Sequence, residues 1–210
     1  MTLFKLLSAL FEYPDQAMLD AIPEILALTD KEPSIEPGER QAIRDFAEWL
    51  GDSDLTEAQA RYVKTFDMTP EHALHLTHHL FGDDKNRGPA LIDLGEYYKS
   101  YGLEIGSNEL PDYLPLVLEF ASMLEEVEIR VFLDPFAKVI AQLGANLAAA
   151  QSPWAPLVRL IEARARLVPT SFVPAPQPAT ETICHDSECE APVTWDTPAQ
   201  PLARPLAAAR

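Results

Sequence analysis

Apolar residues recur every three or four positions through most of residues 2–167, and this is the spacing of one buried face on an α-helix. The segment ELPDYLPLVLEF, residues 109–120, shows the pattern most clearly. We expect Asp112 to be the N-cap of this helix, because a short acidic side chain accepts bonds from the free N–H groups of a first turn. The apolar face of the helix consists of Leu114, Val117, Leu118, Ala121 and Leu124.

The pattern also predicts positions for Pro115 and Glu119 of this segment. Pro115 lies in the first turn of the predicted helix, where its missing N–H costs no intrahelical bond. Glu119 lies between large apolar residues. Because a carboxylate is rarely buried without a partner, we expect Glu119 at the edge of a groove.

The same periodicity predicts four helices in the first third of the chain. The first covers residues 3–12, and the second follows a cap at Asp15, with Pro23 expected to kink or split it. The third ends at Gly51, a residue suited to the left-handed position after a helix. The fourth opens at Asp54, which has a glutamate three residues later, as in a capping box.

Three later helix starts share a polar residue followed by proline, namely Thr69-Pro70, Asp134-Pro135 and Ser152-Pro153. They predict helices over residues 70–81, 134–150 and 153–167. A further helix, residues 88–101, ends at Gly102. No stretch alternates apolar and polar residues between hairpin turns. The sequence therefore predicts an all-α fold, a single helical bundle of eight or nine helices.

The composition changes at Val168. Eight of the 19 prolines fall after this point, where large apolar side chains are few. Such a segment buries too little apolar surface to offset the entropy of ordering it. We therefore expect residues 1–167 to form a helical domain and residues 168–210 to form a flexible, Pro-rich tail.

The charge balance excludes several classes of partner. The chain has 210 residues and a net charge of −17, which repels nucleic acid and anionic lipid and favours basic or cationic amphipathic partners. No apolar run is long enough for a membrane span, and the N-terminus lacks the features of a signal peptide. The two cysteines do not form a disulfide framework. We expect a cytoplasmic protein with no direct membrane insertion.

The histidines are a first candidate for chemistry. His72, His75 and His79 share one face of the predicted helix over residues 70–81, a spacing that can hold a metal ion. However, no carboxylate or cysteine occupies a matching position, and the HExxH pattern is missing. We favour a solvated or hydrogen-bonded helix face, on which His75 and His78 can still line a groove.

The segment CHDSEC is a second, weaker candidate. It has two thiols, Cys184 and Cys189, around one histidine, whereas zinc modules more often combine two CxxC pairs. We expect no metal site and no cofactor. A metal-responsive protein that uses His72, His75 and His79, or the Cys184 and Cys189 pair, remains the alternative.

The segment FGDDKNRGP, residues 81–89, lacks the glycine patterns of a phosphate loop, and Asp83 would repel a phosphate. It is either a solvated connection between helices or a binding edge. In the second case Arg87 would form a bidentate bridge to a carboxylate such as Asp112 and hold the loop against the next helix. No nucleophile motif is evident, so we expect no catalytic residues.

Four segments together resemble a known family. They are LLSALFEYPD near the start, YVKTFD at 62–67, LHLTHHLFGDDKNRGPALIDLGEYYKSYGL at 74–103, and ELPDYLPLVLEF at 109–120. In this order they resemble the NarJ-type nitrate reductase assembly chaperones, or delta subunits, within the wider TorD and DmsD family of redox enzyme maturation proteins. The resemblance covers roughly residues 1–165.

The resemblance implies an all-helical cytoplasmic chaperone that is not an enzyme. Such a protein binds the N-terminal leader of the nitrate reductase catalytic (alpha) subunit and supports molybdenum cofactor insertion before membrane docking. Molybdenum cofactor biosynthesis proteins are a further implied class of partner. The acidic surplus agrees, because a basic amphipathic leader suits an interhelical groove with an acidic rim. A chaperone of the same fold for a different molybdoenzyme is a second alternative.

The resemblance also implies site residues. Asp112 and Pro115 match the family signature at the head of a helix, and Asp83 and Arg87 match that of the preceding loop. Family members commonly have histidine after the aspartate of LPD, where this chain has Tyr113, so a titrating role at this position does not carry over. The candidate peptide-binding residues are Asp83, Arg87, Asp112, Tyr113, Pro115, Glu119, His75 and His78.

Overall fold

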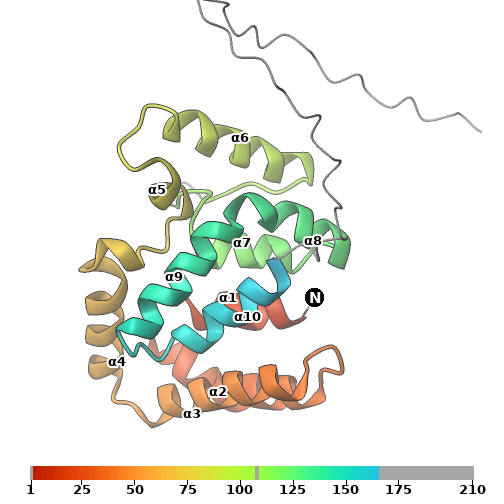
Figure 1. The fold of residues 1–210 in the computed structure, drawn as a ribbon. Coiled ribbons are helices and arrows are strands. Elements are labelled where there is room, and N and C mark those ends of the chain that lie inside the picture. Colours follow the sequence, from red (N-terminus) through yellow and green to blue (C-terminus); the bar gives the residue numbers. More distant parts are fainter. Residues whose placement is uncertain (1, 107–108, 166–210) are drawn as a thin grey trace, which may run out of the picture. The chain divides into compact units, whose positions relative to one another are not determined.

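The computed structural model describes residues 2–106 and 109–165, and this part of the chain is all-helical (Figure 1). Its α-helices are α1 (Thr2–Leu10), α2 (Gln16–Lys31), α3 (Pro37–Asp52), α4 (Leu55–Tyr62), α5 (Leu76–Phe81), α6 (Arg87–Ser100), α7 (Leu114–Ala121), α8 (Glu126–Leu133), α9 (Ala137–Ala149) and α10 (Ala155–Ala165). A π-helix, η1 (Val63–Asp67), and two 3₁₀-helices, η2 (Pro70–His72) and η3 (Asp134–Phe136), complete the list. The described residues contain no strand, so the predicted all-α fold class is confirmed.

The core of the bundle lies around α1 and α10, which occupy the middle of Figure 1. Helix α1 packs on α7, whereas α10 packs on α9, α8 and α3. Leu3 and Leu7 of α1, Leu118 of α7 and Ile161 of α10 are fully buried. These apolar stripes are the ones that the sequence periodicity predicts, and their burial is the main stabilising term.

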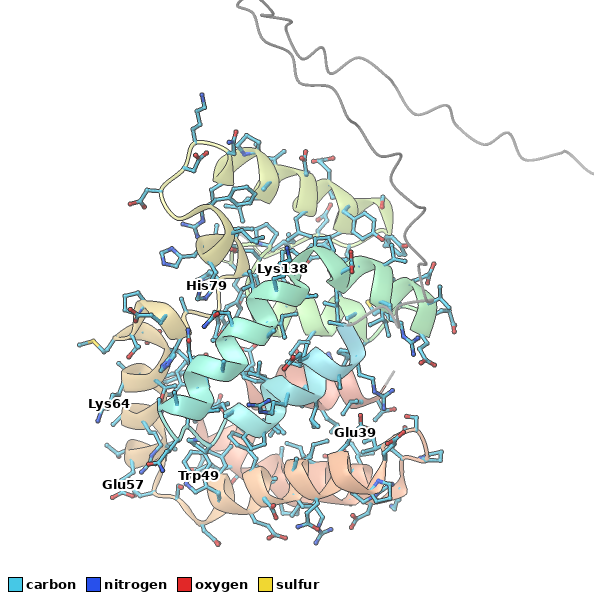
Figure 2. All side chains as sticks on the ribbon, in the orientation of Figure 1. Glu39, Trp49, Glu57, Lys64, His79 and Lys138 are labelled. Carbon is cyan, nitrogen blue, oxygen red and sulfur yellow. The ribbon has the colours of Figure 1, made fainter. Side chains whose placement is uncertain are left out.

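A cluster of aromatic rings joins the two ends of the described chain. Trp154, only 1% exposed, contacts the rings of Phe66 and Trp49 edge to face, with centroids 5.0 and 5.4 Å apart. Its Nε1 atom donates a hydrogen bond to the carbonyl oxygen of Leu10 at 3.2 Å. Figure 2 labels Trp49, which lies on α3. The segment directly before α10 is thereby held against α1, α3 and η1.

Helices α2 and α3 confirm one predicted cap and correct two other expectations. Asp15 is the N-cap of α2, because its carboxylate accepts a hydrogen bond from the Met18 N–H at 2.7 Å. Pro23 lies inside α2, which continues past it as one helix and is not split. Gly51 lies within α3 and does not terminate it. A Cβ atom at Gly51 would lie 3.3 Å from the Cγ2 atom of Ile22, so this glycine allows α2 and α3 to approach closely.

The region after α4 differs from the prediction. Asp54 caps α4 as expected, and the chain continues through η1 to Asp67. The predicted helix over residues 70–81 is wrong, because the chain forms η2, leaves the helical conformation at Ala73, and re-enters a helix only at α5. The backbone at residues 74–76 pairs instead with residues 112–114, as described below.

The later helices agree with their predicted positions, with small shifts. Helix α6 ends before Gly102, whose φ of +79° suits a residue without a side chain. Pro135 lies in η3, between α8 and α9, so the helix expected from residue 134 begins as a 3₁₀ turn. Helix α8 comes before it, where the sequence pattern predicts no helix. Helix α10 begins two residues after Pro153.

The C-terminal tail predicted for residues 168–210 lies outside the described residues, together with Cys184 and Cys189. The boundary at residue 167 therefore stays a prediction. Within residues 2–106 and 109–165, no helix has the length and hydropathy that crossing a membrane requires.

Candidate functional site

Asp112 is a fully buried carboxylate between α5 and α7. It is not the N-cap of α7, because that position belongs to Tyr113. The Oδ2 atom of Asp112 accepts hydrogen bonds from the backbone N–H and the Oγ1 hydroxyl of Thr77, at 3.0 and 2.5 Å. Thr77 lies in the first turn of α5, so Asp112 caps a helix 35 residues earlier in the chain.

Backbone hydrogen bonds hold the two segments together beside this carboxylate. The Leu76 N–H donates to the Asp112 carbonyl oxygen at 3.1 Å, and the Leu114 N–H donates to the Leu74 carbonyl oxygen at 2.9 Å. The two bonds form an isolated antiparallel bridge between His75 and Tyr113. Because Leu74 and Leu76 are engaged with another segment, residues 70–81 do not form one continuous helix.

The surroundings of Asp112 keep it ionised. Burial has the largest single effect and raises its pKa, but hydrogen bonds from His75 and Thr77 together outweigh burial. The pKa therefore lies below the usual value of 3.8. The Nδ1 atom of His75 lies 3.2 Å from Oδ1, and Arg87 is the other basic group nearby.

The predicted bidentate bridge between Arg87 and Asp112 does not form. The Nη2 atom of Arg87 is 4.0 Å from Oδ2 of Asp112, whereas its Nε atom donates to Thr77 Oγ1 at 3.2 Å. Arg87 is therefore connected to the carboxylate mainly through Thr77, which is 2% exposed and which sequence reasoning missed. Asp83 is exposed in the loop before α6. The only sequence signal for Thr77 is a hydroxyl residue within LHLTHHLF.

Tyr113 connects this cluster to the N-terminal helices. Its ring lies against that of His75, with centroids 5.4 Å apart. Its hydroxyl oxygen lies 3.0 Å from that of Tyr62, which donates to the Phe11 carbonyl oxygen at 2.9 Å. Burial raises the pKa of Tyr113 to about 12, so the phenol is neutral at physiological pH.

An apolar groove opens beside Tyr113 and His75. It consists of two hollows that share Tyr13, with volumes of about 260 and 530 Å³. Tyr13 is 47% exposed and Met68 is 73% exposed. We call this surface the Tyr13 groove, and its apolar or aromatic lining is Tyr13, Ala60, Tyr62, Val63, Phe66, Met68, Ala73, Leu74, His75 and Tyr113.

Carboxylates lie at the edge of the Tyr13 groove. Asp67 is part of its lining, although Lys64 also borders the larger hollow. Burial raises the pKa of Tyr113, and the charges of Glu12, Glu109 and Asp67 raise it further, so these three carboxylates lie near the groove wall. Such an arrangement disfavours negative charge and attracts a basic group.

Other candidate residues lie away from the groove surface. Pro115 is buried in α7, where its carbonyl oxygen accepts a hydrogen bond from Ser8 Oγ at 2.8 Å. Pro115 and Asp112 are therefore buried and do not line the Tyr13 groove. Glu119 is half exposed, forms an ion pair with Lys5 and lines neither hollow of the Tyr13 groove, so its place at a groove edge stays a prediction. His78 is partly exposed on α5, with its ring 5.8 Å from that of His79.

The histidines do not share one helix face. His72 belongs to η2, His75 precedes α5, and His79 lies within α5. His72 Nδ1 lies 3.1 Å from the Thr65 carbonyl oxygen, and His79 Nε2 lies 2.7 Å from that of Ala73. Across the described part of the chain, no three or more His, Cys, Asp or Glu side chains are grouped to hold a metal ion.

The chain matches known proteins over most of its length. The family model described as nitrate reductase delta subunit matches residues 32–159. The nitrate reductase molybdenum cofactor assembly chaperone NarJ of Escherichia coli K12 is 33% identical over 156 residues, which are 74% of this chain and 66% of NarJ. NarW of the same strain is 32% identical over 154 residues, which are 73% of this chain and 64% of NarW. The match thus spans slightly less than two thirds of each relative.

A solved structure has the same fold. It belongs to a candidate redox enzyme maturation protein from Archaeoglobus fulgidus, with a TM-score of 0.53 and 23% sequence identity, and the match covers 76% of this chain and 90% of that one. The family match includes η1, α5, α6 and the head of α7, which build the Asp112 cluster and most of the Tyr13 groove. The chain therefore belongs to the nitrate reductase delta subunit family.

Proposed function

We propose that this protein is an assembly chaperone of respiratory nitrate reductase. It binds the N-terminal leader of the catalytic (alpha) subunit and supports molybdenum cofactor insertion before the enzyme docks at the membrane. The names of the relatives NarJ and NarW and the match to the delta subunit family support this role. The protein acts by binding and holding its client, in the cytoplasm, and catalyses no reaction itself.

The observation that carries the proposal is the Tyr13 groove. Exposed apolar side chains such as Tyr13 and Met68 lie beside carboxylates on a chain whose net charge is −17. An amphipathic leader can place its apolar face on these side chains and a lysine or arginine near Glu12 or Asp67. Met68 suits this role, because an unbranched thioether adapts to partners of different shape.

The Asp112 cluster supports the groove from beneath. Asp112 holds the start of α5 through Thr77, and the bridge between His75 and Tyr113 fixes two side chains of the groove wall. Asp112 itself is fully buried and does not contact the leader. Its role is to position the residues that do.

The proposal is tested by titrating the full chain with a peptide that copies the start of the partner catalytic subunit, about 15 residues or roughly four helical turns. Calorimetry should detect binding. Met68→Asp should weaken the affinity at least about tenfold, or about 1.4 kcal/mol, because the apolar face of the leader would have to pack against a hydrated carboxylate and would lose the methionine contact. The matched control is Ile92→Asp, since Ile92 is 65% exposed but outside the groove.

Two results would contradict the proposal. A silent titration argues against leader binding, and equal affinities of the Met68 and Ile92 variants argue against this groove. If the leader of another molybdoenzyme binds and that of nitrate reductase does not, the chain serves a different client. In cells, deletion of the gene should lower the molybdenum content of nitrate reductase, and molybdenum cofactor biosynthesis proteins should co-purify with the chaperone and its client.

A further inference from the structure

A second apolar groove lies between α6 and α8, on the side of the bundle where α6 forms the outer edge (Figure 1). It has a volume of about 510 Å³. It shares no lining residue with the Tyr13 groove. We call it the α6–α8 groove, and its main lining is Leu94, Tyr97, Val131, Phe132, Pro135 and Phe136.

The floor of this groove is aromatic and well packed. Tyr97 stacks on Phe132 with centroids 5.7 Å apart and an interplanar angle of 9°. Phe132 also contacts Phe120 of α7 edge to face at 4.8 Å, so the floor is continuous with the core. Tyr97 is 39% exposed above this floor, and tyrosine is among the residue types that contribute most to protein–protein contacts.

The groove extends beyond the cavity in both helices. Tyr101, one turn after Tyr97, is 44% exposed and lies edge to face on Phe120 at 5.2 Å. Val127, one turn before Val131, is 74% exposed, and Val131 itself is 61% exposed. From Ala90 to Tyr101 the α6 wall is about 16 Å long, at about 1.5 Å per residue, which matches a helix of roughly eleven residues.

The charges around the groove are acidic. Asp93 lies in the lining and, among the described residues, has no ion pair or hydrogen-bond partner. Glu128 lies close enough to Tyr97 to contribute to its raised pKa. The basic groups of these helices are already paired, Lys99 with Glu96 and Arg130 with Glu126. The carboxylate of Asp93 is therefore available to a basic partner, and Glu128, whose Oε2 atom accepts a hydrogen bond from the Glu125 N–H at 3.1 Å, adds negative charge beside it.

We propose that the α6–α8 groove docks a basic amphipathic helix of a partner protein, at a surface separate from the Tyr13 groove. The apolar face of that helix covers Tyr97, Val127 and Val131, and its lysine or arginine residues face Asp93 and Glu128. A second copy of this chain is the wrong occupant, because a symmetric contact would bring the acidic rims together. The proposal goes beyond the leader-binding function and does not depend on it.

The probe is a fluorescein-labelled amphipathic peptide of about 14 residues, roughly four helical turns, with leucines on one face and lysines on the other. Its binding to the full chain is followed by fluorescence anisotropy. Val131→Asp and Val127→Asp should each weaken binding at least about tenfold. Both side chains are mostly exposed, so the variants should keep the circular dichroism spectrum and melting temperature of the wild type.

Matched controls separate the two grooves. By the proposed function the Tyr13 groove also binds basic amphipathic helices, so the probe is titrated on chains that carry Met68→Asp, which blocks that groove. On this background Ile92→Asp, on α6 outside both grooves, should leave binding of the probe within about twofold. A version of the peptide with glutamate in place of lysine should not bind.

Several outcomes would overturn the proposal. The probe binds the wild type but not the Met68→Asp chain, or it binds the Val131 variant of that chain as tightly as the Ile92 variant. In the first case the leader-binding function stands and the second groove does not. If the wild type sediments as a dimer and Val131→Asp as a monomer, the groove is occupied by a second copy, and the proposed partner is wrong.

Discussion

Asp112 shows how far a single residue can depart from its local sequence context. It precedes α7, and every local rule makes it a cap of that helix. In the structure its carboxylate is directed to Thr77 and His75, and the first turn of α7 begins without it. A buried carboxylate takes the place that offers most donors, because each unsatisfied lone pair in the interior costs free energy.

Asp112→Asn should lower the free energy of unfolding by about 2–4 kcal/mol at pH 7, because a buried anion with several donors is replaced by an amide that cannot accept from all of them. Urea denaturation followed by circular dichroism measures the change. Asp83→Asn, at an exposed aspartate, is the control and should stay within about 0.5 kcal/mol of the wild type. An unchanged unfolding midpoint in Asp112→Asn would contradict the assigned role.

The same carboxylate gives a pH dependence of defined sign. Its pKa in the folded protein is lower than the usual 3.8 that applies in the unfolded chain, so the stabilisation is present above pH 3.8. It is lost as the pH falls through the lower folded pKa. The difference in unfolding free energy between the wild type and Asp112→Asn should therefore shrink below pH 3.8 and stay constant between pH 5 and 7. If the difference in unfolding free energy between the two proteins grows on acidification, the lowered pKa assigned to Asp112 is wrong.

At the scale of elements, helix contacts decide what a glycine does. Gly51 and Gly95 both lie inside helices, and sequence alone treats Gly51 as a terminator. A side chain at Gly51 meets Ile22 of α2, whereas a side chain at Gly95 meets nothing within 4 Å. The same substitution should therefore change the stability of the protein in opposite directions at the two positions.

Gly51→Leu should destabilise the protein by about 1–3 kcal/mol through overpacking between α2 and α3. Gly95→Leu should stabilise it by about 0.5–1 kcal/mol, because leucine has a higher helix propensity than glycine. Thermal and urea unfolding of the two glycine-to-leucine variants measures both changes in stability. Equal effects at the two positions would show that propensity alone governs them.

Local signals predict several element boundaries well. Asp15 and Asp54 cap α2 and α4 as expected, and Gly102 follows α6 with a positive φ. In each case the interaction involves residues at most a few positions apart. The break within residues 70–81 had no such signal, because the partner of Leu74 is Leu114.

At the scale of the whole molecule, the net charge of −17 should make client binding sensitive to salt. Raising the NaCl concentration from about 0.05 to 0.5 M shortens the Debye length from roughly 14 to 4 Å and should weaken leader binding several-fold. Calorimetry at the two salt concentrations measures the change. A leader peptide with its basic residues replaced by glutamine should lose this salt dependence, and salt-independent binding of the natural leader would contradict an acidic recognition surface.

We propose that residues 1–167 fold as a unit, because the core lies within α1–α10. A fragment that ends at residue 167 should melt within about 2 °C of the full chain, since the apolar contacts of the bundle are retained. Differential scanning calorimetry of the two proteins tests this boundary. A fragment that melts more than about 5 °C lower would show that later residues contribute to the bundle.

The sequence by itself determined the all-α fold, the apolar stripes of the helices and several of their caps, because each depends on residues within one or two helical turns of one another. The four motifs, from LLSALFEYPD near the start to ELPDYLPLVLEF at 109–120, also identified the family. Only the tertiary structure decided the partners of Asp112, the break before α5, the role of Gly51 and the walls of both grooves. These features depend on contacts between segments far apart in the chain, such as the 35 residues between Thr77 and Asp112, and no local pattern encodes which distant donor a buried acceptor will meet.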